Sequence, residues 1–264
     1  MQVRSMRTRL IGLGMALLAG AVAGVVSAAE PPAAGQDAES GVVNWRAWRA
    51  GNDVAYIPSL QRGAANFVNY CSGCHSLKYV RWSRLGTDLQ IPDKVLREQL
   101  VPEDAKPTDY IMASFPKADA ENWFGKQPPD LSLEARLRGA DWIYRFLKGF
   151  YLDPTRPTGT NNLVLDGAAM PAVLSSLEGV KAAVFADGAG ASGKVVKHFE
   201  TVTPGRLTPA DYDGFVRDTV NFLDYVSDQS QVERRSIGLW VVLFLLVFTA
   251  FAWMLKKEYW KDVH

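Results

Sequence analysis

The sequence predicts a mostly α-helical domain with long loops and one small β-hairpin, followed by a single transmembrane helix at the C-terminus. Three features of the 264-residue chain predict this arrangement: an uncharged run after a basic start, prolines that fall only between Pro31 and Pro209, and a second uncharged run at residues 237–255. Because proline interrupts helices, the helices between the two runs must be short. A net charge of +1 argues against nucleic acid as a partner.

The first 28 residues have the pattern of a secretory signal peptide. Arg4, Arg7 and Arg9 make the start positive, residues 10–26 carry no charge, and small residues follow. A basic start, an apolar run and a small-residue cleavage site are typical of a signal that is removed after export. The sequence therefore predicts a signal peptide at residues 1–28, with a retained membrane anchor as the alternative.

The C-terminal uncharged run has the length and the flanks of a transmembrane helix. At about 1.5 Å per residue, its 19 residues nearly match a hydrocarbon core about 30 Å thick. Trp240 and Trp253 lie near its ends, where aromatic side chains favour the membrane interface. We expect residues 237–255 to span the membrane and contact lipid, residues 29–236 to be exported, and the lysine-containing tail 256–264 to stay in the cytoplasm. A buried core helix is the alternative.

Both cysteines of the chain lie in the motif CSGCH, which places Cys71, Cys74 and His75 together. C-x-x-C-H is the attachment motif of c-type haem, in which both thiols bond to the macrocycle and the histidine ligates the iron. A thiol–disulfide pair usually begins a helix, whereas the segment before this pair is predicted to be helical. A zinc site needs about four ligands, and only His198 and His264 remain as further histidines. The motif therefore predicts one covalently bound haem c.

The candidates for a sixth iron ligand are Met112, Met170 and His198. Met170 lies in a loop, residues 166–171, in which a glycine permits close approach and a proline stiffens the chain. Met112 lies in an apolar stretch that predicts a buried helix. Met170 is therefore the favoured ligand, and a thioether opposite a histidine raises the reduction potential of iron.

Helices are predicted near both ends of the exported domain. Residues 59–70 carry apolar side chains at helical spacing. Thr208 followed by Pro209 is typical of a helix N-cap and a first helical position. The first and last helices of c-type cytochromes cross beside the haem, so the aromatic residues of these helices are either haem contacts or ordinary packing residues. Between the helices, residues 184–202 hold a glycine-rich run between short apolar stretches, which indicates a β-hairpin.

Five motifs follow one another along the chain. They are CSGCH, the run PPDLSL at residues 128–133, the stretch DWIYRFLKGFY at residues 141–151, the Met170–Pro171 pair and the single C-terminal membrane helix. Their order and combination resemble the cytochrome c1 family, the haem-bearing subunits of ubiquinol–cytochrome c reductase. The segment between residues 151 and 170 is short compared with mitochondrial members, which suggests a bacterial protein.

This resemblance implies roles for two further residues. The Pro129 carbonyl would accept a hydrogen bond from the His75 ring and so orient that iron ligand. Arg138 would pair with a haem propionate, because a buried carboxylate needs a hydrogen-bonded cation; Arg136 is the weaker candidate. A solvated helix face is the alternative for both arginines.

The resemblance also implies electron transfer inside a quinol-oxidising respiratory complex. The chain would accept one electron from a Rieske iron–sulfur protein and pass it to soluble cytochrome c. It would lie beside cytochrome b in a bacterial inner membrane, with its haem domain in the periplasm, and have no substrate-converting site of its own. An independent membrane-tethered c-type electron shuttle is the main alternative, and a tethered thiol–disulfide protein is another.

Residues 93–121 contain seven acidic and four basic residues, a net charge of −3. The whole segment 30–236 also has a net charge of −3, from 26 acidic and 23 basic residues. A basic electron acceptor would be steered toward residues 93–121, at a rate that falls as salt increases. A solvated loop with scattered charges is the alternative.

Overall fold

The computed structural model describes residues 42–186 and 195–262. The chain divides after Ala33 into two units, and all of the described residues belong to the second unit, Ala34–His264. The predicted signal peptide and the glycine-rich turn of the predicted hairpin lie outside the described residues.

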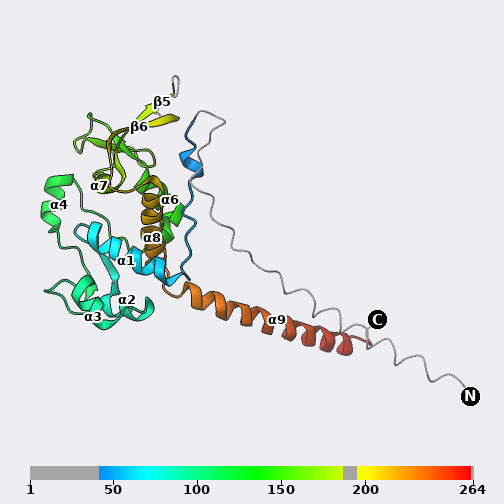
Figure 1. The fold of residues 1–264 in the computed structure, drawn as a ribbon. Coiled ribbons are helices and arrows are strands. Elements are labelled where there is room, and N and C mark those ends of the chain that lie inside the picture. The colour runs from blue at the N-terminus through cyan, green and yellow to red at the C-terminus, as the bar shows by residue number, and fades with distance from the viewer. Residues whose placement is uncertain (1–41, 187–194, 263–264) are drawn as a thin grey trace, which may run out of the picture. The chain divides into compact units, whose positions relative to one another are not determined.

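Helices predominate in the described residues, as the sequence predicts (Figure 1). In chain order they are a 3₁₀ turn (Trp45–Ala47), α1 (Ile57–Tyr70), α2 (Trp82–Asp88), α3 (Asp93–Val95), a π-helical turn (Leu96–Leu100), α4 (Lys117–Phe124), α5 (Glu134–Arg138), α6 (Ala140–Lys148), α7 (Ser175–Glu178), α8 (Pro209–Ser227) and α9 (Gln231–Tyr259). The strands of the described ranges form three antiparallel pairs: β1 (Leu77–Arg81) with β2 (Tyr110–Ile111), β3 (Phe150–Leu152) with β4 (Thr160–Asn162), and β5 (Gly179–Phe185) with β6 (Val196–Pro204). The β5–β6 pair is the predicted hairpin; the sequence did not predict the other two pairs.

Helices α1 and α8 cross in close contact at Gly63. A Cβ atom on Gly63 would lie 2.1 Å from the carbonyl oxygen of Asp218 and 2.6 Å from Cβ of Phe222, so glycine alone fits this crossing. The rings of Phe67 and Phe222 pack 5.8 Å apart between the two helices, and both side chains are buried. Burying one such ring contributes about 1.5–3 kcal/mol. These two rings therefore pack between the helices, and their role as haem contacts stays a prediction.

Buried polar groups fix the register of the same two helices. The Asp218 carboxylate accepts hydrogen bonds from Ser59 Oγ at 2.6 Å and from Arg62 Nη2 at 3.0 Å. Asn221 Nδ2 donates to Ser59 Oγ at 2.9 Å and to the Asp53 carbonyl at 2.8 Å. Since a buried polar group without a partner is costly, these bonds favour one alignment of α1 on α8.

The predicted start of the last helix is confirmed. Thr208 is the N-cap of α8, its Oγ1 accepts the Asp211 N–H at 3.2 Å, and Pro209 is the first helical residue. The segment before α1 is bonded to the helical domain as well. The Ala50 N–H donates to Asp141 Oδ1 at 2.8 Å, and the Ala50 carbonyl accepts from Arg217 Nε at 3.0 Å. Ala50 thereby joins the N-terminal segment to both α6 and α8.

The prediction of a buried helix around Met112 is wrong. Tyr110 and Ile111 form β2, and Met112 is 56% exposed. The strand forms because Ile111 pairs with Leu77 of β1, and this pairing leaves Ile111 only 1% exposed. Strand pairing here overrides a local apolar pattern that is compatible with a helix.

Helix α9 contains the predicted membrane-spanning residues 237–255 and extends past them at both ends. Its 29 residues include a window with a mean hydropathy of 2.4, none of which is buried. Within residues 42–186 and 195–262, it is the one helix whose length and composition suit a membrane span. Arg234 in its first turn pairs with Asp228 at 2.6 Å, and Asp228 also pairs with Arg136 of α5 at 3.1 Å.

Gly63→Ala should destabilise the folded domain by at least about 2 kcal/mol, because the added methyl group meets backbone atoms of α8 that cannot rotate away. Gly214→Ala, also in α8, is the matched control. Nothing lies within 4 Å of a Cβ at Gly214, so this change should raise stability by about 0.5–1 kcal/mol. Urea unfolding of the haem-loaded protein, followed by circular dichroism, measures both effects. Equal stability of the two variants would contradict the close crossing.

Candidate functional site

One cavity brings together the residues that the sequence singles out as haem and iron ligands. Cys71, Cys74, His75 and Met170 line it, and so does Pro129; we call it the CSGCH cavity. It opens to solvent. The rest of its wall is mostly apolar: Tyr70, Phe124, Lys126, Gln127, Pro128, Ala169, Pro171 and Val173.

The CSGCH motif continues from the C-terminal end of α1 into a tight turn. The His75 N–H donates to the Cys71 carbonyl at 2.8 Å, and the Gly73 carbonyl accepts from the Phe115 N–H at 2.9 Å. Cys71 is half-buried, Cys74 is exposed, and the two do not form a disulfide with each other. The turn therefore presents two thiols and one imidazole to the same cavity.

The His75 ring is held by a backbone carbonyl of the Pro-Pro turn. Its Nδ1 lies 2.7 Å from the Pro129 carbonyl oxygen, which can only accept a hydrogen bond, so Nδ1 carries the proton. The lone pair of Nε2 is then available to a metal ion. This contact is the one that the resemblance implies for Pro129.

The turn that carries Pro129 is tied to the segment after the motif. The Asp130 carboxylate accepts the Lys78 N–H at 2.9 Å and the Ser132 N–H at 3.0 Å. The Leu131 N–H donates to the Ser76 carbonyl at 2.9 Å. These bonds fix the Pro129 carbonyl against the histidine ring.

Protonation states at the motif suit metal ligation better than thiol exchange. Burial lowers the pKa of His75, and the hydrogen bond to Pro129 acts in the opposite direction, so the ring is neutral and able to ligate a metal. Burial raises the pKa of the Cys71 thiol to about 12. A reactive cysteine needs a lowered pKa, as at a helix N-terminus, whereas Cys71 follows the C-terminus of α1. The thiol–disulfide alternative is therefore disfavoured.

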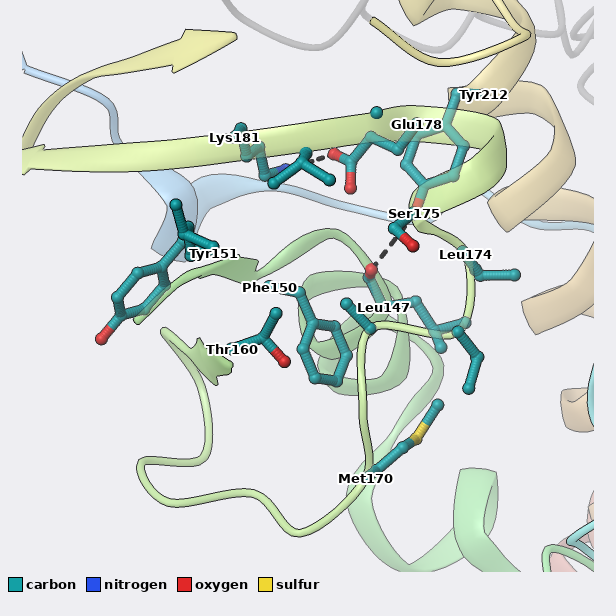
Figure 2. Close-up of a pocket in the computed structure, with 15 residues that line it drawn as sticks. Leu147, Phe150, Tyr151, Thr160, Met170, Leu174, Ser175, Glu178, Lys181 and Tyr212 are labelled. Atoms are coloured by element: carbon teal, nitrogen blue, oxygen red, sulfur yellow. Dashed lines mark hydrogen bonds and ion pairs between the residues drawn. The ribbon is translucent and has the colours of Figure 1, made fainter. Parts of the chain in front are cut away.

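Met170 lines both the CSGCH cavity and a second cavity, which Figure 2 shows. The second cavity has Met170 at one end and Glu178, Lys181 and Tyr212 at the other. Glu178 and Lys181 form an ion pair, and the Tyr212 hydroxyl donates to the Leu147 carbonyl at 3.2 Å. Burial raises the pKa of Glu178 and lowers that of Lys181. The charges behind the Met170 loop are therefore paired with each other.

The other two candidates for a sixth ligand lie elsewhere. Met112 lines a surface groove with Arg81 and Asp109. His198 Nε2 lies 3.4 Å from Glu200 within β6. Among the described methionines and histidines, those that line the CSGCH cavity are Met170 and His75.

The structure does not place Arg138 on the wall of the CSGCH cavity. The Arg138 guanidinium pairs with Glu134 and lies 4.3 Å from the centre of the Trp142 ring, and Arg136 pairs with Asp228. A cation that does line the cavity is Lys126. Sequence reasoning missed it, although its position just before the Pro-Pro turn was a usable signal. The propionate role of Arg138 stays a prediction.

The donor set fits a c-type haem. Two thiols at C-x-x-C spacing suit two thioether bonds, while an imidazole nitrogen and a thioether sulfur suit the two axial positions of iron. Cys71, Cys74, His75 and Met170 supply these donors in one cavity, and its mostly apolar wall suits a macrocycle. A haem held in this way can store and release single electrons.

Comparisons with known proteins point to the same chemistry. The model of the Cytochrome C1 family matches residues 55–263. The chain is 49% identical over 213 residues to a cytochrome c1 of Allochromatium vinosum. The aligned residues cover 80% of this chain and 87% of that protein. It is 41% identical over 212 residues to an ammonia monooxygenase gamma subunit of Nitrosomonas europaea, covering 80% of this chain and 86% of that one. It is 29% identical over 243 residues to a cytochrome c1 of Rhodospirillum rubrum, and the alignment covers 78% of this chain and 82% of that protein.

Met170→Leu should leave the haem bound through Cys71 and Cys74 but lower its reduction potential by on the order of 0.1 V or more, because axial ligands set the potential. Leucine cannot ligate iron, so the reduced variant should bind carbon monoxide. Redox titration and carbon monoxide difference spectra measure both changes. Met112→Leu is the matched control and should behave as the unchanged protein. An unaltered potential together with no carbon monoxide binding in Met170→Leu would reject the ligand assignment.

Proposed function

The chain belongs to the cytochrome C1 family, and we propose that it carries single electrons from a Rieske iron–sulfur protein to a soluble cytochrome c. Family membership makes it a haem-bearing electron-transfer subunit of the bc1 complex, which also contains cytochrome b. The observation that supports the proposal most is the convergence of Cys71, Cys74, His75 and Met170 on one cavity. No acid–base pair or nucleophile is required, because no bond of a substrate is made or broken.

The residues of the CSGCH cavity have separate tasks in this function. Haem c, when bound, supplies a one-electron iron couple. Cys71 and Cys74 would attach the macrocycle covalently, and His75 and Met170 would hold the iron. The Pro129 carbonyl keeps the imidazole in one orientation. Ligands that stay in place in both oxidation states keep structural reorganisation small, and the thioether raises the potential.

The anchorage that goes with this function is a single membrane pass. Residues 237–255 of α9 would span a bacterial inner membrane and contact lipid. Residues 29–236 would lie in the periplasm after removal of the signal peptide at residues 1–28, and residues 256–264 would lie in the cytoplasm. The basic residues in the last turn of α9 support this orientation, because cytoplasmic flanks of membrane helices are rich in lysine and arginine.

The full chain, solubilised from membranes in a mild detergent, should elute together with b-type haem and an iron–sulfur protein. Subunits of a stable complex share large apolar interfaces that survive such treatment. Difference spectra report the b- and c-type haems, and electron paramagnetic resonance reports the iron–sulfur centre.

Each outcome of that purification selects one function. A c-type spectrum without companions would support the independent tethered shuttle instead. Co-elution of monooxygenase subunits would point to an assembly like the one named for the N. europaea relative. A chain without covalent haem would overturn both the proposed function and the tethered shuttle.

The acidic segment at residues 93–121 supports docking of a basic acceptor. All seven of its acidic side chains are exposed: Asp93, Glu98, Glu103, Asp104, Asp109, Asp119 and Glu121. Two contacts link the segment to the CSGCH cavity. The Phe115 N–H bonds to Gly73 of the motif, and Gln127 of the cavity wall donates to Glu121 at 2.9 Å. Negative charge thus adjoins the cavity that would hold the haem.

Replacing Glu103, Asp104 and Asp109 together by their amides should lower the rate of cytochrome c reduction at low ionic strength by roughly threefold to tenfold and flatten its salt dependence. The reduction potential should stay unchanged, because none of the three residues lines the CSGCH cavity. Stopped-flow kinetics over a range of ionic strength measures the rate. The single variants Glu103→Gln and Glu200→Gln, the latter on β6, each remove one negative charge. Comparing their rates separates the effect of position from the effect of losing a charge. An unaltered salt slope in the triple variant would place the docking charges elsewhere.

A further inference from the structure

The loop that carries Met170 begins at two consecutive buried asparagines on β4. Asn161 is 2% exposed and Asn162 is not measurably exposed, at 0%. An asparagine side chain offers two donors and one acceptor oxygen. Burial of two such side chains requires partners for all of these groups, and the partners lie in the loop itself and in the elements around it.

Asn162 fixes the start of the loop to α6. Its Oδ1 accepts the N–H groups of Val164 at 2.8 Å and Leu165 at 3.2 Å, and its Nδ2 donates to the Phe146 carbonyl at 2.8 Å. Phe146 lies in the last turns of α6. The first residues of the loop therefore have one position relative to the helical domain.

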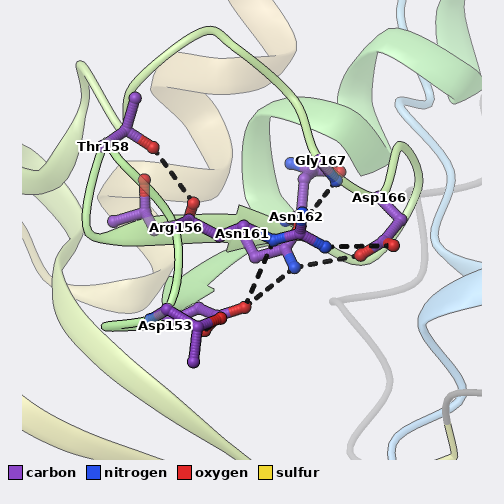
Figure 3. A network of polar contacts seen from close by, with 9 residues as sticks. Asp153, Arg156, Thr158, Asn161, Asn162, Asp166 and Gly167 are labelled. Carbon is purple, nitrogen blue, oxygen red and sulfur yellow. Dashed lines mark hydrogen bonds and ion pairs between the residues drawn. The ribbon is translucent and has the colours of Figure 1, made fainter.

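Asn161 binds the loop at Asp166 and Gly167, which precede Met170 (Figure 3). Its Nδ2 donates to Asp166 Oδ1 at 2.9 Å and to Asp153 Oδ2 at 2.9 Å, and its Oδ1 accepts the Gly167 N–H at 3.0 Å. Gly167 has a φ of +69°, a conformation that favours glycine. Asp166 and Gly167 are thus held by one side chain, a few residues before the proposed ligand.

A cation completes this network and offsets part of its negative charge. Arg156 Nη2 lies 3.2 Å from Asp166 Oδ2, and Arg156 Nε lies 3.7 Å from Asp153 Oδ2. Hydrogen bonds from Thr155 and Asn161 lower the pKa of Asp153, so its carboxylate stays ionised as an acceptor. Asn161 and Arg156 both join the two carboxylates, and Asn161 is the one of the two that also binds the backbone at Gly167.

We propose that Asn161 is the positioning residue for the Met170 sulfur: it holds the 163–170 loop in the conformation that directs Met170 into the CSGCH cavity. A thioether is a soft ligand and binds the harder ferric iron weakly. The sulfur stays on ferric iron only if the loop has few other conformations to adopt. This inference rests on the proposed function, because it takes Met170 to be the axial ligand.

Asn161→Asp tests the proposal with almost no change in shape. The variant loses both donors and adds a carboxylate next to Asp153 and Asp166. The population of ferric protein with detached sulfur should rise on the order of tenfold, because two hydrogen bonds to charged acceptors are lost. The expected signs are a weaker charge-transfer absorption of the methionine–iron bond, a lower potential, and faster carbon monoxide binding by the reduced protein.

Asn221→Asp is the matched control. Asn221 is 1% exposed and donates to Ser59 and to the Asp53 carbonyl, away from the Met170 loop. This change should lower stability toward urea but leave the charge-transfer band and the potential unchanged. If Asn161 has only a structural role, Asn161→Asp should behave like Asn221→Asp, with lower stability but an unchanged charge-transfer band and potential. That result would overturn the proposal.

Two further variants make every outcome decisive. If Asn161→Asp does not fold, Asp166→Ala is the substitute variant. It removes one bond of Asn161 together with the Arg156 ion pair from an exposed position, and it should shift the same three signals in the same direction, by less. If Asp166→Ala changes none of them, the proposal fails. Met170→Leu, measured in parallel, separates this failure from failure of the ligand assignment: if that variant keeps the potential and the charge-transfer band, Met170 is not the ligand.

Discussion

The proposed site depends on one constraint: His75 and Met170, which are far apart in the sequence, must be held at the same cavity by backbone that cannot shift. The crossing of α1 and α8 at Gly63 provides the rigid body but does not itself line the cavity. Each proposed ligand lies outside that crossing, on a turn or a loop. Each is therefore held by polar contacts of its own, the Pro129 carbonyl on one side and the Asn161 and Asn162 side chains on the other.

The two sides of the cavity use the same physical means. A buried hydrogen bond adds little net stability, but a buried polar group that loses its partner costs about 1–3 kcal/mol. Networks around Asp130 and Asn161 therefore act mainly by making other loop conformations unfavourable. This matters most where proline and glycine leave long segments without regular secondary structure, as between β4 and α7. Covalent attachment through Cys71 and Cys74 would fix the macrocycle in the same way, by removing alternatives.

The sequence predicted the parts of the fold that follow from local patterns and missed those that follow from pairing at a distance. The helix start at Thr208, the hydrophobic α9 and the β5–β6 hairpin all have local signatures, and the structure contains them. The buried helix expected around Met112 is instead a strand, because its partner, β1, lies earlier in the chain. The Asn161 network could not be predicted for a similar reason. An Asn-Asn pair is typical of a loop, and Asn161 is brought to Asp153 only by the pairing of β3 with β4.

The contacts at the junction between the helical domain and α9 differ in kind from those around the CSGCH cavity. No residue of α9 belongs to the buried core of the described ranges, so the domain does not need α9 for its packing. The described side-chain contacts at the junction centre on Asp228, which binds Arg234 of α9 and Arg136 of α5.

The hydrogen bond from Arg234 lowers the pKa of Asp228 below its usual range. A carboxyl group whose pKa is lowered by folding contributes stability at neutral pH and loses it only as the pH falls through the lowered value. These ion pairs are therefore intact at neutral pH, and because they are partly exposed each has only a modest strength. The proposed electron transfer requires a rigid iron site, whereas the anchor needs only to stay attached, and the contacts at the cavity and at the junction differ accordingly.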